Sequence, residues 1–179
     1  MIKLLFIGAP GSGKGTQAKF LKKYNLYQIS PGEIIRKSKD KRVIKYRKES
    51  EKGEFLPNRL IFEILKKEIN NLPKKANGYI LDGAVRTIEQ AEYVKKYNLV
   101  NEVVFYKIKK KTAIKRILSR KDGRNDDNPK IIKKRFFEYK NKTKPVLKFL
   151  RKNFPFYKIS AEGTPKEINK ETIKRLKLK

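Results

Sequence analysis

A glycine-rich run near the N-terminus holds the residues whose types and spacing best fit a chemical role. Residues 8–16 read GAPGSGKGT, which contains the GxxxxGK core of a phosphate-binding loop, or P-loop, with Lys14 as its lysine. Small residues in such a loop let successive backbone N–H groups converge on phosphate oxygens, and the lysine adds a positive charge. Gly15 stands where the strict motif has Ser or Thr, and Thr16 follows it. The run therefore predicts a site for nucleotide phosphates.

The chain contains no cysteine and no histidine. Without cysteine there are no disulfides and no thiolate metal sites, which fits a reducing compartment. Without histidine there is no imidazole base and no histidine-ligated zinc. Catalysis would then depend on lysine, arginine, carboxylates, hydroxyls, backbone amides or a bound ion. Phosphoryl transfer suits this composition, because it is catalysed mostly by positioning and electrostatic stabilisation.

The elements around the loop supply the context that a P-loop needs. An apolar run at residues 4–7 predicts a buried strand before it, and helical spacing begins at Thr16 after it. Further strands are expected at residues 27–29, 79–82, 103–108 and 156–160. Helical patterns occupy residues 32–39, 41–52, 58–72, 87–97, 111–120, 129–152 and 165–176. This alternation predicts an α/β fold, a three-layer α/β/α domain with a five-stranded parallel sheet whose ligands lie beyond the carboxyl ends of the strands.

Individual residues mark the expected ends of several helices. Asn58 is expected to cap the helix that Pro73 stops, and Thr87 is expected to open the next one. Pro145 should kink or divide the helical segment 129–152, because proline lacks the backbone N–H and clashes with the preceding turn. Pro165 is expected as the first residue of the last helix.

Length and charge bound the remaining possibilities. The 179 residues suit a single domain, 1–179. The net charge of +30 allows nonspecific binding of polyanions such as RNA, but its even spread also fits a lysine-rich proteome, and the aromatic residues show no pattern of a stacking platform. The first apolar run is too short for a secretory signal or a membrane span. We expect a cytoplasmic protein with no membrane association and no obligate protein partner.

Four ordered segments resemble the adenylate kinase family. GAPGSGKGTQ at residues 8–17 is similar to the family's P-loop, in which Gly-Thr follows the lysine. ISPGEIIR at 29–36 resembles the segment that holds the monophosphate, and LDGAVRTIEQA at 81–91 resembles the family's LDGFPRTxxQA. The arginine-rich stretch from Arg116 to Tyr139 resembles R-x-x-x-R…GR-x-DD…R-x-x-x-Y, and residues 162–164 resemble the loop near the ATP base.

The resemblance implies a kinase that transfers a phosphoryl group reversibly between ATP and AMP, giving two ADP, with Mg²⁺ as cofactor and no zinc. It implies ATP-binding roles for Gly11, Ser12, Gly13, Lys14, Gly15, Thr16, Arg116, Arg120 and Gly163. It implies AMP-binding roles for Pro31, Arg36, Leu56, Gly83, Arg86, Gln90, Arg124 and Arg135. The implied catalytic residues are Lys14, Arg86, Arg120, Arg124 and Arg135.

The resemblance also implies how the metal and the moving parts are arranged. Asp82 would hold Mg²⁺ through water; the alternative is an aspartate that caps the turn before Gly83. Asp126 and Asp127 would anchor the lid arginines, or simply cap the next helix. The monophosphate-binding insert is expected at 30–59 and a very short lid at 121–127, both mobile. Short members of the family are generally monomers, and we expect a monomer here.

Departures from the family pattern leave alternatives open. Pro31 replaces a threonine near the monophosphate base, Glu33 replaces an aspartate, and Ala84-Val85 replaces Phe-Pro. A UMP/CMP kinase of the same fold is therefore an alternative, as is an inactive relative of these kinases. A P-loop RNA-binding or assembly factor, suggested by the net charge, is an alternative of another class. For a single arginine in so basic a chain, a solvated surface charge is the default interpretation.

Overall fold

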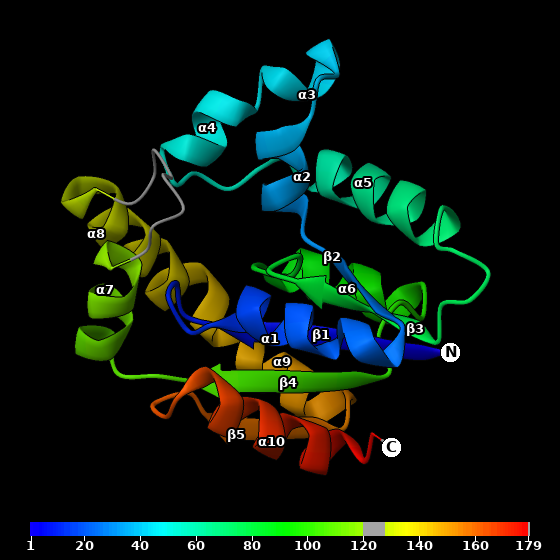
Figure 1. Ribbon diagram of the computed structural model, residues 1–179. Coiled ribbons are helices and arrows are strands. Elements are labelled where there is room, and N and C mark those ends of the chain that lie inside the picture. The colour runs from blue at the N-terminus through cyan, green and yellow to red at the C-terminus, as the bar shows by residue number, and fades with distance from the viewer. Residues whose placement is uncertain (120–127, 179) are drawn as a thin grey trace.

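A computed structural model describes residues 1–119 and 128–178. Within these residues five parallel strands form one sheet in the order β2-β3-β1-β4-β5 (Figure 1). The strands are β1 (Ile2–Gly8), β2 (Leu26–Ile29), β3 (Gly78–Asp82), β4 (Glu102–Lys107) and β5 (Phe156–Ser160). In the centre of the sheet, Leu5 of β1 pairs with Leu81 of β3 and Val103 of β4. The predicted five-stranded parallel sheet is confirmed.

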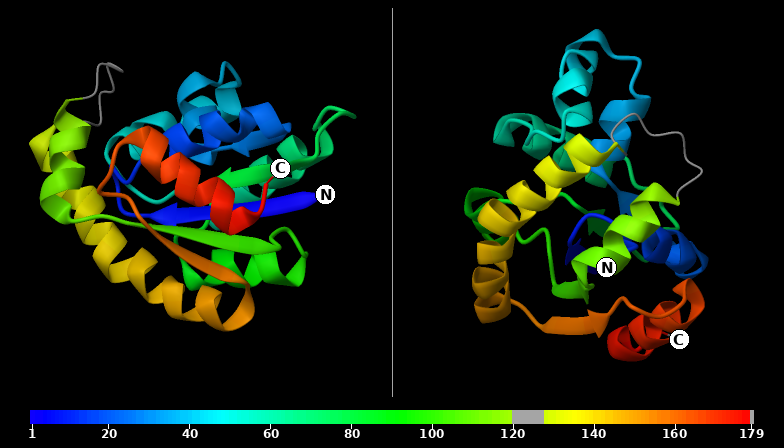
Figure 2. Two further views of the ribbon diagram at one scale, coloured as in Figure 1. Left: turned by 60° about the horizontal axis from the view of Figure 1, so that its bottom comes forward. Right: turned by 90° about the vertical axis from the view of Figure 1, so that its left-hand side faces the viewer.

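Each face of the sheet is covered by helices, because successive residues of a strand point to opposite sides. Leu4 and Phe6 of β1 pack toward α1 (Lys14–Phe20) and α10 (Pro165–Leu176). Leu5 and Ile7 pack on the other side, in a core shared with α5 (Asn58–Asn70), α6 (Ile88–Lys96) and α9 (Lys144–Asn153). Figure 2 shows α10 on one side of the sheet and α6 and α9 on the other. The predicted three-layer arrangement is therefore confirmed.

Residues 129–153 form a long helical segment, here called the helical arm, which is divided near the predicted Pro145. Helix α8 (Pro129–Glu138) passes through a π-helical turn, η2 (Tyr139–Thr143), into α9, which has Pro145 in its first turn. The wider turn accommodates a residue that cannot donate a backbone hydrogen bond and whose ring clashes with the preceding turn. Helix α7 (Lys110–Leu118) packs against α8 around Ile117 and Phe136.

The chain between β2 and α5 forms short helices above the carboxyl ends of the strands (Figure 1). These are α2 (Pro31–Lys37), α3 (Lys41–Ile44) and α4 (Arg47–Glu51). Residues that follow α4 reach α8, where Glu54 forms an ion pair of 2.9 Å with Lys134. A short 3₁₀ turn, η1 (Leu21–Tyr24), ends the segment begun by α1.

The helix ends test the local predictions. Thr87 caps α6 by accepting from the Gln90 N–H, and Pro165 is the first residue of α10, as predicted. The prediction that Asn58 is an N-cap is wrong, because Pro57 holds that position and Asn58 is already helical. The Asn58 side chain instead bonds to Glu89 and Gln90 of α6. Among the described helices, none is long and apolar enough to cross a membrane.

Candidate nucleotide-binding site

The P-loop connects β1 to α1 and lies against α7. Gly11 has a φ of +78°, and a Cβ atom there would lie 2.5 Å from the carbonyl oxygen of Ala113. Only glycine tolerates both this backbone conformation and this close approach. Ser12 is fully buried inside the turn. The loop therefore has a compact shape that rests on α7.

The ammonium group of Lys14 is held inside this loop. Its Nζ donates to the carbonyl oxygens of Gly8 at 2.9 Å and Ala9 at 3.1 Å, and to the Ser12 hydroxyl at 3.3 Å. These neutral acceptors orient the charge without cancelling it. A phosphate oxygen that enters the loop would meet a cation whose position is already fixed.

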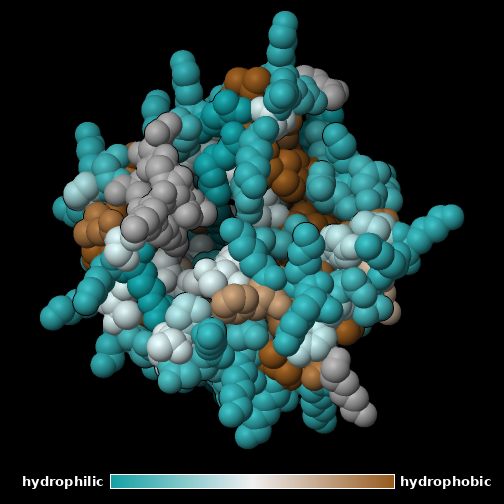
Figure 3. Space-filling model, in the orientation of Figure 1, coloured by the Kyte–Doolittle hydropathy of each residue, from teal (hydrophilic) through white to brown (hydrophobic). Residues whose placement is uncertain are grey.

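A cleft of about 190 Å³ opens at the carboxyl end of the sheet, in front of the P-loop. Figure 3 shows that mostly hydrophilic side chains cover this side of the molecule. Predicted site residues from distant segments line the cleft: Gly11, Ser12, Gly13, Lys14, Gly15, Thr16, Arg36, Asp82, Gly83, Arg86 and Arg135. Lys19 and Glu33 complete its charged lining, and a hydrogen bond from Lys37 lowers the pKa of Glu33. Positive charge predominates, which suits a phosphate-bearing ligand.

Arg86 and Arg36 approach each other over Gly32. A Cβ atom at Gly32 would lie 3.4 Å from Nη1 of Arg36 and 3.9 Å from Nη2 of Arg86. Nε of Arg86 donates to the carbonyl oxygen of Gly83 at 3.0 Å, which fixes the base of the guanidinium. Two planar forks that converge on one point can bind the several oxygens of a phosphate together.

Asp82 lies at the end of β3 beside the P-loop. Its Oδ2 accepts a hydrogen bond of 2.8 Å from Nε2 of Gln28, and a Cβ atom at Gly15 would lie 3.3 Å from the same oxygen. Within residues 1–119 and 128–178, no group of three carboxylates forms a metal cage. One carboxylate next to a phosphate loop fits Mg²⁺, which keeps several waters and is held largely by substrate phosphates.

A second, much smaller cavity adjoins the cleft. Its volume is about 10 Å³, room for about one water molecule. It is lined by the predicted residues Pro31, Leu56, Gly83, Arg86 and Gln90, together with Gly32, Phe55, Ile61 and Ala84. The structure thus brings these predicted residues together, but a nucleobase could enter only if they moved apart.

Gln90 is turned inward, and only 3% of it is exposed. Its Oε1 accepts from the backbone N–H of Arg86 at 2.7 Å, and its Nε2 donates to Oδ1 of Asn58 at 2.9 Å. The inward position ties α5 and α6 to the small cavity.

Arg116 and Gly163 meet where α7 contacts the loop that follows β5. Nη1 of Arg116 donates to the Ala161 carbonyl oxygen and Nη2 to that of Gly163, both at 2.7 Å. The Glu162 carboxylate accepts from the Lys109 N–H and the Thr112 hydroxyl, and these bonds lower its pKa. The loop is tied to α1 as well, because Gln17 donates to the Pro165 carbonyl oxygen.

Arg120, Arg124, Asp126, Asp127 and the predicted lid 121–127 lie outside the described residues. At the start of α8, the capping group is the side chain of Asn128, which accepts from the Ile131 N–H at 3.0 Å.

Two site residues were missed from sequence. Gln28 donates a hydrogen bond to Asp82. Its place as a polar residue inside the expected strand 27–29 is a signal in the sequence that could have identified it. The centre of the Phe55 ring lies 5.6 Å from the guanidinium carbon of Arg86. No local pattern in the sequence distinguishes this aromatic residue from the others. Only the packing of the chain between β2 and α5 brings Phe55 to the site.

Comparison with known proteins gives a consistent family. A family model described as adenylate kinase matches residues 6–154. Among the relatives is an adenylate kinase of Buchnera aphidicola subsp. Cinara cedri, 38% identical over 96% of this chain and 95% of its own. Others are an adenylate kinase of Leptospira biflexa, 36% identical over 98% of this chain and all of its own, and one of Prochlorococcus marinus (strain MIT 9515), 36% identical over 97% of each chain.

Proposed function

Since this chain belongs to the adenylate kinase family, we propose that the cleft around Lys14 transfers a phosphoryl group from ATP to AMP, reversibly, to give two ADP. The observation that carries this proposal is the meeting of Lys14, Arg36, Arg86 and Arg135 around one cleft. A phosphoryl group in transit spreads negative charge over its oxygens, and fixed cations stabilise it.

The two substrates would occupy opposite ends of this arrangement. The P-loop, Gly11 to Thr16, would hold the ATP phosphates, with Lys14 on the β- and γ-phosphates. The loop that Arg116 fastens at Gly163 would lie beside the ATP base. Arg36 and Arg86 would grip the AMP phosphate, and Arg135 would face the group in transit. We assign Arg120 and Arg124, which lie outside the described residues, to the same phosphates.

The monophosphate base would enter beside Pro31, Leu56 and Gln90. Gln90 would exchange its present partners, Asn58 and the Arg86 N–H, for the edge of adenine. The small volume of this cavity supports an insert, 30–59, that opens to admit AMP and closes over it. Closure of the insert and of the lid 121–127 would exclude water from the transferring group.

Mg²⁺ would arrive with ATP and be held by Asp82 through water. When bound, it would neutralise part of the phosphate charge. Gln28 would position the carboxylate by keeping its hydrogen bond to Oδ2. We also propose that the protein acts as a cytoplasmic monomer.

The test is formation of nucleoside diphosphate from ATP and Mg²⁺ with each of AMP, CMP, UMP and GMP. We expect turnover with AMP and its loss in Lys14→Ala, with the fold of the variant checked by circular dichroism. Faster turnover with CMP or UMP would instead make the protein a UMP/CMP kinase. No turnover with any acceptor would exclude both activities, leaving an inactive relative or a P-loop RNA-binding or assembly factor.

A further inference from the structure

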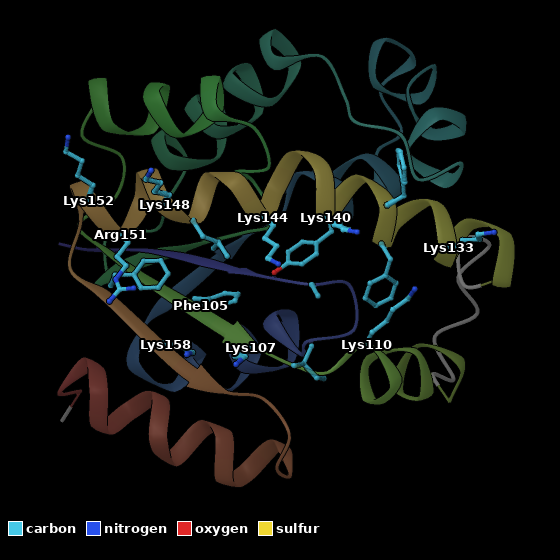
Figure 4. Close-up of a pocket in the computed structure, with 17 residues that line it drawn as sticks. Phe105, Lys107, Lys110, Lys133, Lys140, Lys144, Lys148, Arg151, Lys152 and Lys158 are labelled. Atoms are coloured by element: carbon cyan, nitrogen blue, oxygen red, sulfur yellow. The ribbon is translucent and has the colours of Figure 1, made fainter.

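A large groove lies apart from the nucleotide cleft, between the edge of the sheet and the helical arm. Its volume is about 990 Å³. Strands β4 and β5 form one wall, with Phe105 and Phe156, while η2 and α9 form the other (Figure 4). We call it the β5–α9 groove. Ala9 and Tyr139 lie where it approaches the back of the P-loop.

Cations surround this groove. Six come from the helical arm: Lys133, Lys140, Lys144, Lys148, Arg151 and Lys152. Three more come from the sheet side and the start of α7: Lys107, Lys110 and Lys158 (Figure 4). In the part of the chain that the structure describes, no carboxylate lines the groove, and none of the nine forms an ion pair. Nine exposed like charges around one concave surface repel each other, and a polyanion would relieve that repulsion.

The cations of α9 follow a regular spacing. Lys144, Lys148 and Lys152 succeed each other at four-residue intervals on one face of the helix. A helix rises 1.5 Å per residue, so about 6 Å along the axis separates each from the next. A single small anion would need only one or two of these groups. The row instead suits a chain of repeated negative charges.

Aromatic rings line the wall that β4 and β5 form. The rings of Phe105 and Phe156 lie 6.1 Å apart, centre to centre, on adjacent strands. Phe137 of α8 also lines the groove, and 62% of it is exposed. Stacking of bases on such rings contributes strongly to the binding of single strands. The aromatic residues show no stacking pattern along the sequence, because β4, α8 and β5 meet only in the folded chain.

We propose that the β5–α9 groove binds single-stranded nucleic acid, with phosphates on its cations and bases on the exposed ring of Phe137 and the partly exposed rings of Phe105 and Phe156. A duplex keeps its bases stacked inside and could use only the cationic rim. The inner surface of the groove is mostly apolar, as a lipid site would be, but cations line both of its walls (Figure 4), whereas a lipid carries its charge at one end. The groove contains neither Lys14 nor the arginines of the cleft, so we expect binding there to be separable from the kinase reaction.

The test uses fluorescence anisotropy with a labelled oligouridine of about 12 nucleotides, within the site sizes known for single domains. The groove variant is Lys148→Glu/Arg151→Glu/Lys158→Glu, and the matched control is Lys66→Glu/Lys74→Glu/Lys170→Glu, all at exposed positions. Both variants change the net charge equally. We expect the groove variant to bind at least tenfold more weakly, and its slope of log affinity against log salt to fall by about 2, since each phosphate contact contributes ~0.7. Both triple variants should keep kinase turnover.

Further variants test whether binding of the oligonucleotide depends on the aromatic rings and whether it depends on the P-loop. Phe137→Ala should weaken oligouridine binding about tenfold, while Phe20→Ala, at another exposed ring, should not. Lys14→Ala should keep oligouridine binding. Equal losses in the groove and control triples would overturn the proposal by making the binding a property of net charge alone. Equally tight, groove-dependent binding of a duplex, polyglutamate or anionic phosphatidylglycerol vesicles would overturn it in favour of a general polyanion surface.

Discussion

The guanidinium carbon of Arg86 lies 5.6 Å from the centre of the Phe55 ring, and the Lys142 ammonium lies 5.0 Å from the same centre. Phe55 thus joins the loop after β3 to the helical arm, through a ring that belongs to the insert. A cation over an aromatic face is stabilised by the ring quadrupole, and it is oriented by that contact. The relationship makes Phe55 a positioning residue for Arg86.

Phe55→Ala should therefore weaken AMP binding in particular. Cation–π contacts contribute ~0.5–2 kcal/mol, so we expect the KM for AMP to rise about two- to thirtyfold while the KM for ATP changes little. Steady-state kinetics with each substrate varied in turn gives both constants. Phe55→Tyr, which keeps an aromatic face, should restore most of the affinity. Equal rises in both KM values would contradict a role confined to the Arg86 side.

We expect binding of ATP to require the guanidinium group of Arg116, and not merely a positive charge at this position. Lysine cannot span the Ala161 and Gly163 carbonyl oxygens with one planar fork, so Arg116→Lys should loosen the 161–163 loop. Charge-assisted bonds of this kind contribute ~1.5–3 kcal/mol, and we expect about a tenfold rise in the KM for ATP. Lys115→Ala, at the exposed neighbouring position, serves as the matched control. An unchanged KM for ATP in Arg116→Lys would separate this loop from ATP binding.

A buried hydroxyl pair links β4 to α10. Thr172 donates to the Ile168 carbonyl oxygen at 2.7 Å, so its single proton is used and Tyr106 must be the donor in their 3.2 Å bond. Tyr106→Phe should lower the free energy of unfolding by ~1 kcal/mol, because it removes this one bond. Thr172→Val should cost more, ~1–3 kcal/mol, since it leaves the Tyr106 hydroxyl buried without its acceptor.

Urea unfolding of both single variants and the double variant measures this pair. The cost in Tyr106→Phe/Thr172→Val should be smaller than the two single costs together, because the two residues contact each other. Strict additivity would show that the hydroxyls do not interact in solution.

Tyr79 should make folding sensitive to alkaline pH. Its side chain is 1% exposed, its hydroxyl donates to the Leu99 carbonyl oxygen at 2.9 Å, and burial raises its pKa from 10.0 to about 12. Below pH 10.0 the phenol keeps its proton in the folded and in the unfolded chain. As the pH rises from 10.0 toward about 12, the unfolded chain loses this proton while the folded chain still holds it. The free energy of unfolding therefore falls over this range.

The measurement is the free energy of unfolding of wild type relative to Tyr79→Phe. This difference should be constant below about pH 9 and should fall steadily above it, because phenylalanine cannot ionise. Tyr97→Phe, at an exposed position, is the control and should follow the wild-type curve. A difference that stayed flat up to about pH 11.5 would show that Tyr79 ionises equally in both states.

The sequence alone determined the elements whose signals are local. The glycines and Lys14 of residues 8–16, the apolar runs of the strands, and Thr87, Pro145 and Pro165 act through their immediate neighbours, and the structure places each as predicted. Parallel topology follows, because helices separate successive strands and make each connection a crossover. The four ordered motifs also sufficed to identify the family.

Tertiary structure decided the partnerships between distant residues. Asn58 accepts a hydrogen bond from Gln90 and does not cap its helix. Gln28 donates a hydrogen bond to Asp82, and the Arg86 guanidinium lies over the ring of Phe55. The β5–α9 groove likewise exists only because β4, β5 and the helical arm meet. The first three contacts join residues at least 31 positions apart along the chain. No local spacing encodes them, because they depend on how whole elements pack across the sheet.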